Sequence, residues 1–143
     1  MNTRIDYLYR DGSNYKAAGH AVLTGAADAG QIAAIMALMD CDFGSGPASF
    51  IPGQVGLEDL QGCFATATGQ SVWDDEVDHP WHEVTGIETT DQPATVPMGV
   101  VEFLDRLRTV TWDPDYRPAL ASGPDAARLR GGDAVETVYL PGP

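Results

Sequence analysis

Basic side chains are scarce in this chain, which has eight lysine and arginine residues against 21 aspartate and glutamate residues in a length of 143. Lys16 is the only lysine, and no further base occurs until Arg106, although 14 of the 21 acidic residues lie between these two positions. With a net charge of -13, the chain can neutralise few phosphates, which argues against direct binding to nucleic acids or anionic lipids. A surface of this kind favours cationic partners.

The acidity is also compatible with two origins that involve no protein partner. An Asp-rich, Lys-poor composition is expected of a GC-rich genome or a salt-adapted proteome, in which acidic surface keeps proteins soluble. The acidic groups could instead line an active site. If the acidic surface has a specific role, we expect it to dock on a basic protein. One form of this role is to imitate the charge of a nucleic acid.

Cysteine is rare and long apolar runs are missing. Cys41 and Cys63 form no Cys-x-x-Cys pair, and the N-terminus has no apolar leader, so we expect reduced thiols in a cytoplasmic protein, although the spacing permits one disulfide. The longest apolar run, 32–39, is far shorter than the ~20 residues that span a bilayer. We therefore expect no membrane segment.

Length and a hydrophobic content of 43% predict a packed core in one domain. We expect an α+β fold over residues 1–111, in which an N-terminal β-hairpin extends to a small, mainly antiparallel sheet and two amphipathic helices cover one face. Residues 112–143 are rich in proline and glycine and predict an irregular arm, packed on the domain or on a partner, in which 135–140 could form a last strand.

The alternation of apolar and polar residues predicts where the strands lie. It predicts a hairpin from 5–10 and 15–24 around a turn at 11–14, and two further strands at 64–68 and 81–89. A short helical turn is expected at 57–60.

Two apolar stripes with helical spacing predict the helices. The first contains Ile32, Ile35, Met36 and Met39, is capped by Asp28 and ends after residue 39. The second runs over 97–110 and presents Val100, Phe103, Leu104, Leu107 and Val110 on one face.

The predicted hairpin tip is the first candidate for a binding site. It gathers aromatic rings and two of the few bases of the chain, in the residues Tyr9, Arg10, Asp11, Asn14, Tyr15 and Lys16. Arginine can grip a carboxylate or phosphate with two parallel hydrogen bonds, and lysine adds a point charge, so the tip is suited to anion recognition. The alternative is structural: an Arg10–Asp11 pair and hydrogen bonds of Asn14 would fix the turn.

The same residues carry a resemblance. The string Tyr9-Arg10-Asp11 with Asn14-Tyr15-Lys16, followed by 50–52, 54–57 and His82-Glu83, resembles a family of short uncharacterised bacterial proteins that open with a Tyr-Arg-Asp-x-x-Asn-Tyr-Lys motif. The resemblance covers about residues 5–86. It implies a standalone cytoplasmic domain and no particular reaction.

An acidic loop before the last predicted strand of the domain is the second candidate. If it held a metal, the ligands would be Asp74, Asp75, Asp78, His79 and His82. Pro80 prevents a helix that would align the two histidines, and the spacing matches neither an EF-hand nor a His-Glu-x-x-His motif, so we expect a solvated loop and no metal.

The sequence also lacks a Gly-x-Ser-x-Gly motif, a phosphate-binding loop and a dinucleotide fingerprint, and we expect no cofactor. These observations favour a noncatalytic binding or adaptor protein, for example a subunit of a bacterial assembly, that binds a basic protein or a second copy of itself. The alternative is a small metal-dependent hydrolase that uses the loop at 74–83. Whether the chain is an enzyme is left undecided by its sequence.

Overall fold

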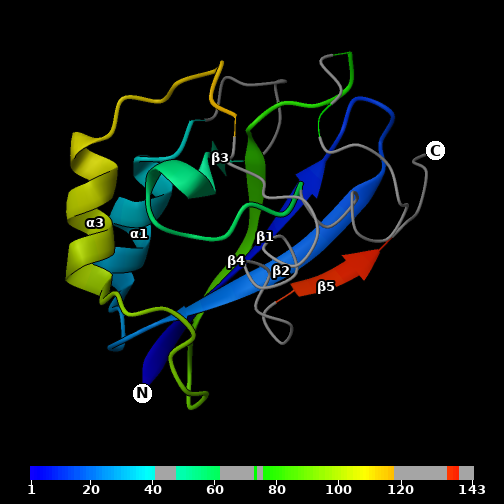
Figure 1. Ribbon diagram of the computed structural model, residues 1–143. Helices are drawn as coiled ribbons and strands as arrows, with labels where there is room; N and C mark the ends of the chain where they lie inside the picture. The colour runs from blue at the N-terminus through cyan, green and yellow to red at the C-terminus, as the bar shows by residue number, and fades with distance from the viewer. Residues whose placement is uncertain (41–47, 62–72, 74–75, 118–134, 139–143) are drawn as a thin grey trace.

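The protein has a small α+β fold, and the residues that the structure describes form one antiparallel sheet and two α-helices (Figure 1). The computed structural model describes residues 1–40, 48–61, 73, 76–117 and, for the backbone alone, 135–138. The expected fold class is therefore confirmed.

The sheet is built around the N-terminal strand. Its spatial order is β3-β4-β1-β2-β5, and every neighbouring pair is antiparallel. The strands are β1 (Asn2–Arg10), β2 (Lys16–Leu23), β3 (Ser49–Phe50), β4 (His82–Thr90) and β5 (Val135–Val138). The predicted hairpin and the strand expected at 81–89 are thus present.

Period-two alternation gives β1 one buried face. Thr3, Ile5, Tyr7 and Tyr9 are buried, and the residues between them are partly exposed. Because successive side chains of a strand point to opposite faces, Arg4, Asp6, Leu8 and Arg10 lie on the other side of the sheet.

The helix α1 (Ala29–Ala37) begins at the predicted cap. The Asp28 side chain accepts a hydrogen bond from the Gln31 N–H, and the Gln31 side chain accepts one from the Asp28 N–H, which makes a complete capping box. The stripe predicted for this helix meets the core, with Ile35 and Met39 buried and Ile32 and Met36 partly buried.

The helix α3 (Val100–Thr109) has the expected charge pattern. Glu102 lies in its first turn and Arg106 and Arg108 in its last, which complements the helix dipole, and the Arg106 guanidinium lies 2.6 Å from Glu102. The helix begins three residues later than predicted, after Gly99, whose neighbour Val100 donates to the Thr24 carbonyl oxygen.

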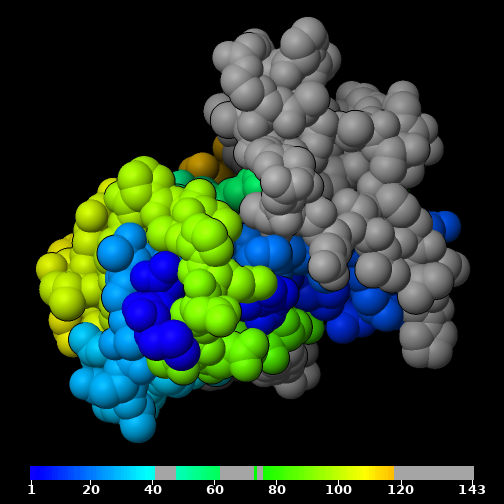
Figure 2. Space-filling view, turned by 90° about the horizontal axis from the view of Figure 1, so that it is seen from below, coloured from blue at the N-terminus to red at the C-terminus, as the bar shows by residue number. Residues whose placement is uncertain are grey.

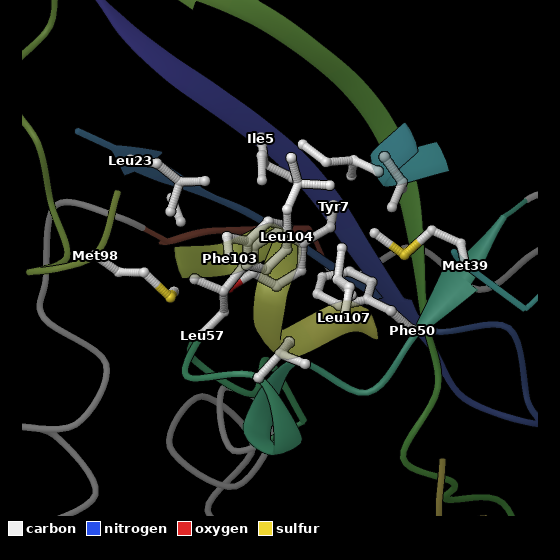
Figure 3. Close-up of a cluster of buried hydrophobic side chains, with 14 of the residues drawn as sticks. Ile5, Tyr7, Leu23, Met39, Phe50, Leu57, Met98, Phe103, Leu104 and Leu107 are labelled. Carbon is white, nitrogen blue, oxygen red and sulfur yellow. The ribbon is translucent and has the colours of Figure 1, made fainter. Parts of the chain in front are cut away.

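The core fills the space between the helices and the buried face of the sheet. In Figure 3, Phe103, Leu104 and Leu107 of α3 gather against Ile5 and Tyr7 of β1, with Leu23 and Phe50 beside them. Seen from below, the start of β1 reaches the surface between α1 and the segment 91–98 that leads to α3 (Figure 2).

One local prediction is wrong. The helical turn expected at 57–60 is absent, and a 3-10 turn, η2 (Pro52–Gln54), occurs just before it. Proline fixes φ near the helical value and its missing N–H costs nothing in a first turn, so Pro52 favours helix start there. Gly56, at φ 88°, then reverses the chain.

Several expectations fall outside the described residues, namely the strand at 64–68, Cys41, Cys63 and most of the arm. Within the arm, 135–138 form β5, which pairs with β2 and so joins the sheet of the domain. In the part of the chain that the structure describes, no helix is long and apolar enough to cross a membrane.

Candidate functional site

The two segments that the sequence singles out form a single structure. The hairpin tip at 9–16 packs against the loop 76–83, although about 70 residues separate them in the chain. The Gly12 N–H donates to the Val77 carbonyl oxygen at 2.7 Å, and an added Cβ on Gly12 would lie 3.2 Å from the Val77 Cα. Glycine permits this close backbone approach, since a larger residue would force the Val77 backbone to shift.

The turn of the hairpin is fixed by its own polar side chains. The Asp11 carboxylate accepts hydrogen bonds from the N–H groups of Ser13 and Tyr15, both at 2.9 Å. Asn14 has φ 67°, a left-handed conformation that asparagine tolerates better than most residues. Asp11 and Asn14 therefore have structural roles in the turn.

Arg10 is held by groups of its own chain. Its guanidinium binds Glu83 of β4 at 2.9 Å, and also donates to the Asn14 side-chain oxygen at 2.5 Å. The expected structural partner, Asp11, is thus replaced by Glu83. The side chains of Arg10 and Glu83 are 40% and 22% exposed, and the cation is already matched by a carboxylate. Tyr15 is exposed, and Lys16 lies opposite Arg10 in the hairpin register.

Tyr9 is fully buried. Its hydroxyl donates to Asp78 at 2.5 Å, and the Gln61 side-chain amide donates to the other oxygen of the same carboxylate at 3.0 Å. Burial, followed by the bond to Asp78, raises the pKa of Tyr9 far above its usual range, so the hydroxyl is a fixed donor. Tyr9 therefore belongs to the core and is not available for stacking with a ligand.

Both nitrogens of His79 are used by the backbone. Nε2 lies 2.7 Å from the Arg10 carbonyl oxygen, and Nδ1 accepts from the Trp81 N–H at 3.1 Å. Nε2 consequently carries the proton of a neutral ring. Burial lowers the pKa of His79, which agrees with this assignment.

His82 is held in the same way at the start of β4. Nε2 accepts from the Leu60 N–H at 3.0 Å, and Nδ1 lies 3.0 Å from the Pro80 carbonyl oxygen, so the proton is on Nδ1. The side chain is 0% exposed, and burial lowers its pKa to about 3. Asp59 lies 3.9 Å from Nε2, but this is no ion pair because that nitrogen carries no proton.

Asp59 is a buried acid that the sequence gives no reason to select. Its side chain is 6% exposed, Oδ1 accepts from the Gln61 N–H at 2.8 Å, and Oδ2 has no hydrogen-bond partner within the described residues. Burial raises the pKa of Asp59 to about 7, and the nearby Asp78 adds to the shift. Asp59 also contributes to the raised pKa of Tyr116, after burial of that phenol.

The described residues of the predicted metal site form hydrogen bonds with other groups of the protein. Asp78 accepts from Tyr9 and Gln61, and the two histidines bind backbone groups with all four ring nitrogens. Within the residues described, no group of three His, Cys, Asp or Glu side chains is arranged to hold a metal ion. Asp74 and Asp75 lie outside those residues.

The hairpin tip and the loop thus use their polar and aromatic groups on each other. The ring centroid of Tyr9 lies 5.2 Å from that of His79 and 5.1 Å from that of His82, and each polar atom of these three rings bonds a neighbouring residue. Such a cluster fixes the position of the hairpin against β4. Of the predicted tip residues, Tyr15 is exposed and Tyr9 is buried. The others are partly exposed, namely Arg10, Asp11, Asn14 and Lys16.

Comparison with known proteins gives no matching family model, no similar curated protein and no similar solved structure. The resemblance to bacterial proteins with the Tyr-Arg-Asp-x-x-Asn-Tyr-Lys motif stays a prediction.

Proposed function

We propose that the protein is a noncatalytic binding or adaptor protein whose acidic surface recognises a basic protein. The observation that carries this proposal is the pairing of its arginines. Arg4, Arg10, Arg106 and Arg108 each lie within 3.5 Å of a carboxylate of the same chain. Among the residues that the structure describes, few cations therefore stay free to offset the remaining acids.

The other described lysine and arginine residues, Lys16 and Arg117, add little. Arg117 lies over the Trp73 ring at 5.4 Å, and among the described lysine and arginine residues Lys16 alone has neither a carboxylate nor a ring partner. Glu88, Asp91 and Asp115 are exposed, and none of them forms an ion pair within the described residues. These three carboxylates are therefore accessible to a cationic surface and are not engaged in ion pairs within the part of the chain that the structure describes.

The hydrogen bonds of the two histidines in the loop support the proposal that the protein is not a catalyst. A general base needs a group that can accept a proton from a substrate, whereas the ring nitrogens of His79 and His82 are committed to backbone groups. The rival hydrolase would bind a stoichiometric metal in a native mass spectrum. A metal-free complex with a basic protein supports the adaptor.

The salt dependence of association tests the proposal. For a basic partner isolated at low salt and then purified, we expect stopped-flow association to slow by about 10-fold or more between ~50 and ~500 mM NaCl, because salt screens long-range attraction. Dissociation should change little. An association rate that ignores salt, in a protein whose Tm rises with salt, would identify the acidity as a solubility trait.

A further inference from the structure

The strand β4 has a sheet partner along only part of one edge. β1 pairs with it from His82 to Thr90, but β3 pairs only with His82 and Glu83, and a last hydrogen bond joins the Val84 N–H to the Ala48 carbonyl oxygen at 2.9 Å. Figure 1 shows β3 beside one end of β4 alone. Within the described structure, Thr85–Thr90 make no backbone hydrogen bond on the side away from β1.

This open edge is accessible. Thr85, Glu88 and Thr89 are exposed, and Gly86, Ile87 and Thr90 are partly exposed. Six residues of strand extend about 20 Å, at ~3.3 Å per residue, which is the length of an ordinary strand in a sheet. Alternate residues of an edge strand present unpaired N–H and C=O groups that can pair with another chain.

A bulge begins the open edge. Tyr7 lies opposite Val84 and Asp6 lies opposite Gly86, so Thr85 is the additional residue in β4. Beyond it the side chains alternate regularly. Ile87 lies opposite Ile5 on the helix-covered face, and Glu88 lies opposite Arg4 on the other face.

The two faces differ in what they offer a new strand. On the helix-covered side, the half-buried Ile87 would pack beside an apolar or β-branched side chain. On the other side Glu88 has no ion-pair partner among the described residues, since the guanidinium of Arg4 binds Asp6 at 2.9 Å and Gln92 at 3.2 Å. A lysine or arginine in the new strand would supply the missing cation.

We infer that the edge Thr85–Thr90 of β4 is the surface that binds the basic partner, by adding an extended segment in which basic and β-branched residues alternate. This inference rests on the proposed function and specifies its binding mode. Backbone hydrogen bonds would provide affinity, and the alternating side chains would provide specificity. A second copy of this chain fits the edge poorly, because it would bring together two chains of net charge -13.

The test uses a ten-residue peptide of alternating lysine and valine and two N-methylated forms of it. In one form the amides on one edge of the extended peptide are methylated, and in the other form those on the opposite edge. All three carry the same charge. At ~50 mM NaCl we expect the parent peptide to shift the NMR signals of Thr85–Thr90 selectively, and one methylated form to bind at least about 10-fold more weakly than the other, because strand addition uses one edge of the peptide.

Matched variants localise the binding. Glu88→Lys and Asp115→Lys change the net charge equally, and both residues are exposed. We expect the Glu88 variant to lose several-fold more affinity for the parent peptide, with unchanged Tm in both. If the two methylated peptides bind equally and the NMR shifts are spread over all exposed acidic residues, the peptide does not bind by strand addition. That result contradicts this inference but not the proposed function. Failure of all three peptides to bind contradicts the proposed function as well.

Discussion

The two ends of β4 differ in what contacts them. At its start, His82 and Glu83 are held by Leu60, Pro80 and Arg10, and β3 covers the edge. From Thr85 onward the edge has no strand beside it within the described structure. The polar side chains that look most like an active site in the sequence therefore stabilise the fold, whereas the plain, threonine-rich half offers unpaired backbone groups to a partner.

The largest effect should come from His82. Replacing His82 with Ala removes a fully buried ring and leaves the Leu60 N–H without its acceptor. We expect a loss of about 3–4 kcal/mol of unfolding free energy, measured by urea denaturation. The matched change in the open half, Thr89→Val, should stay within about 0.5 kcal/mol. If the two variants lose the same stability, the contrast between the halves of β4 is wrong.

Next in size is a change in pH dependence at Asp59. The pKa of Asp59 in the folded state, about 7, exceeds the ordinary value of 3.8. The folded state therefore binds more protons than the unfolded state between these two values, and Asp59 lowers the unfolding free energy increasingly as pH rises from about 4 to 7. Asp59→Asn preserves the acceptor for the Gln61 N–H. The variant should exceed the wild type by roughly 1–3 kcal/mol at pH 8 and approach it at pH 4.

His82 acts in the opposite direction over the same range. Its folded pKa of about 3 lies below the ordinary value of 6.5, so its stabilising contribution is present above pH 6.5 and is lost as pH falls toward 3. Because both proteins contain His82, the test compares the unfolding free energies of wild type and Asp59→Asn at each of several pH values and uses their difference. A difference that does not change with pH would show that Asp59 titrates normally.

A smaller effect is expected at Tyr9. The variant Tyr9→Phe keeps the ring contacts but removes the hydrogen bond to Asp78 and the acceptor of the His79 N–H. We expect a loss of about 1–2 kcal/mol in chemical denaturation, because the acceptor is a carboxylate that keeps its second donor, Gln61. An unchanged stability would mean that the hydroxyl does not hold the loop to the hairpin.

The smallest effect should follow from changes at the exposed tip. The double variant Arg10→Ala, Lys16→Ala removes a partly exposed ion pair and a single lysine, so the cost should be under about 1 kcal/mol and the Tm should fall by only a few degrees. Calorimetry checks this directly. A loss comparable to that of His82→Ala would show that the tip side chains, and not only its backbone, stabilise the fold.

Local patterns were enough to predict most elements of the fold. The alternation of buried residues in β1, the Asp28 cap and the stripe of α3 are all short-range features, and each is observed as predicted. The start of α3 and the turn at 52–54 differ because Gly99 and Pro52 override the apolar pattern locally.

The candidate site depended on contacts that no local pattern contains. Tyr9 meets Asp78, and Arg10 meets Glu83, across about 70 residues of sequence, so two separate predicted sites became one structural cluster. Burial of Asp59 depends on the same packing. Gly86, a glycine within a strand, is a sequence indication of the bulge at Thr85, since such glycines often accompany irregular pairing.

Amide hydrogen exchange of β4 tests the central claim most directly. In the free protein, the amides of Thr85–Thr90 that point away from β1 should exchange rapidly, whereas those of Leu60 and Val84, which bind His82 and Ala48, should be protected. Addition of the alternating lysine–valine peptide should slow exchange at the outward-pointing amides of Thr85–Thr90 and leave Leu60 and Val84 unchanged. Slow exchange of those outward-pointing amides in the free protein, or no added protection with the peptide bound, would contradict the proposed division of β4.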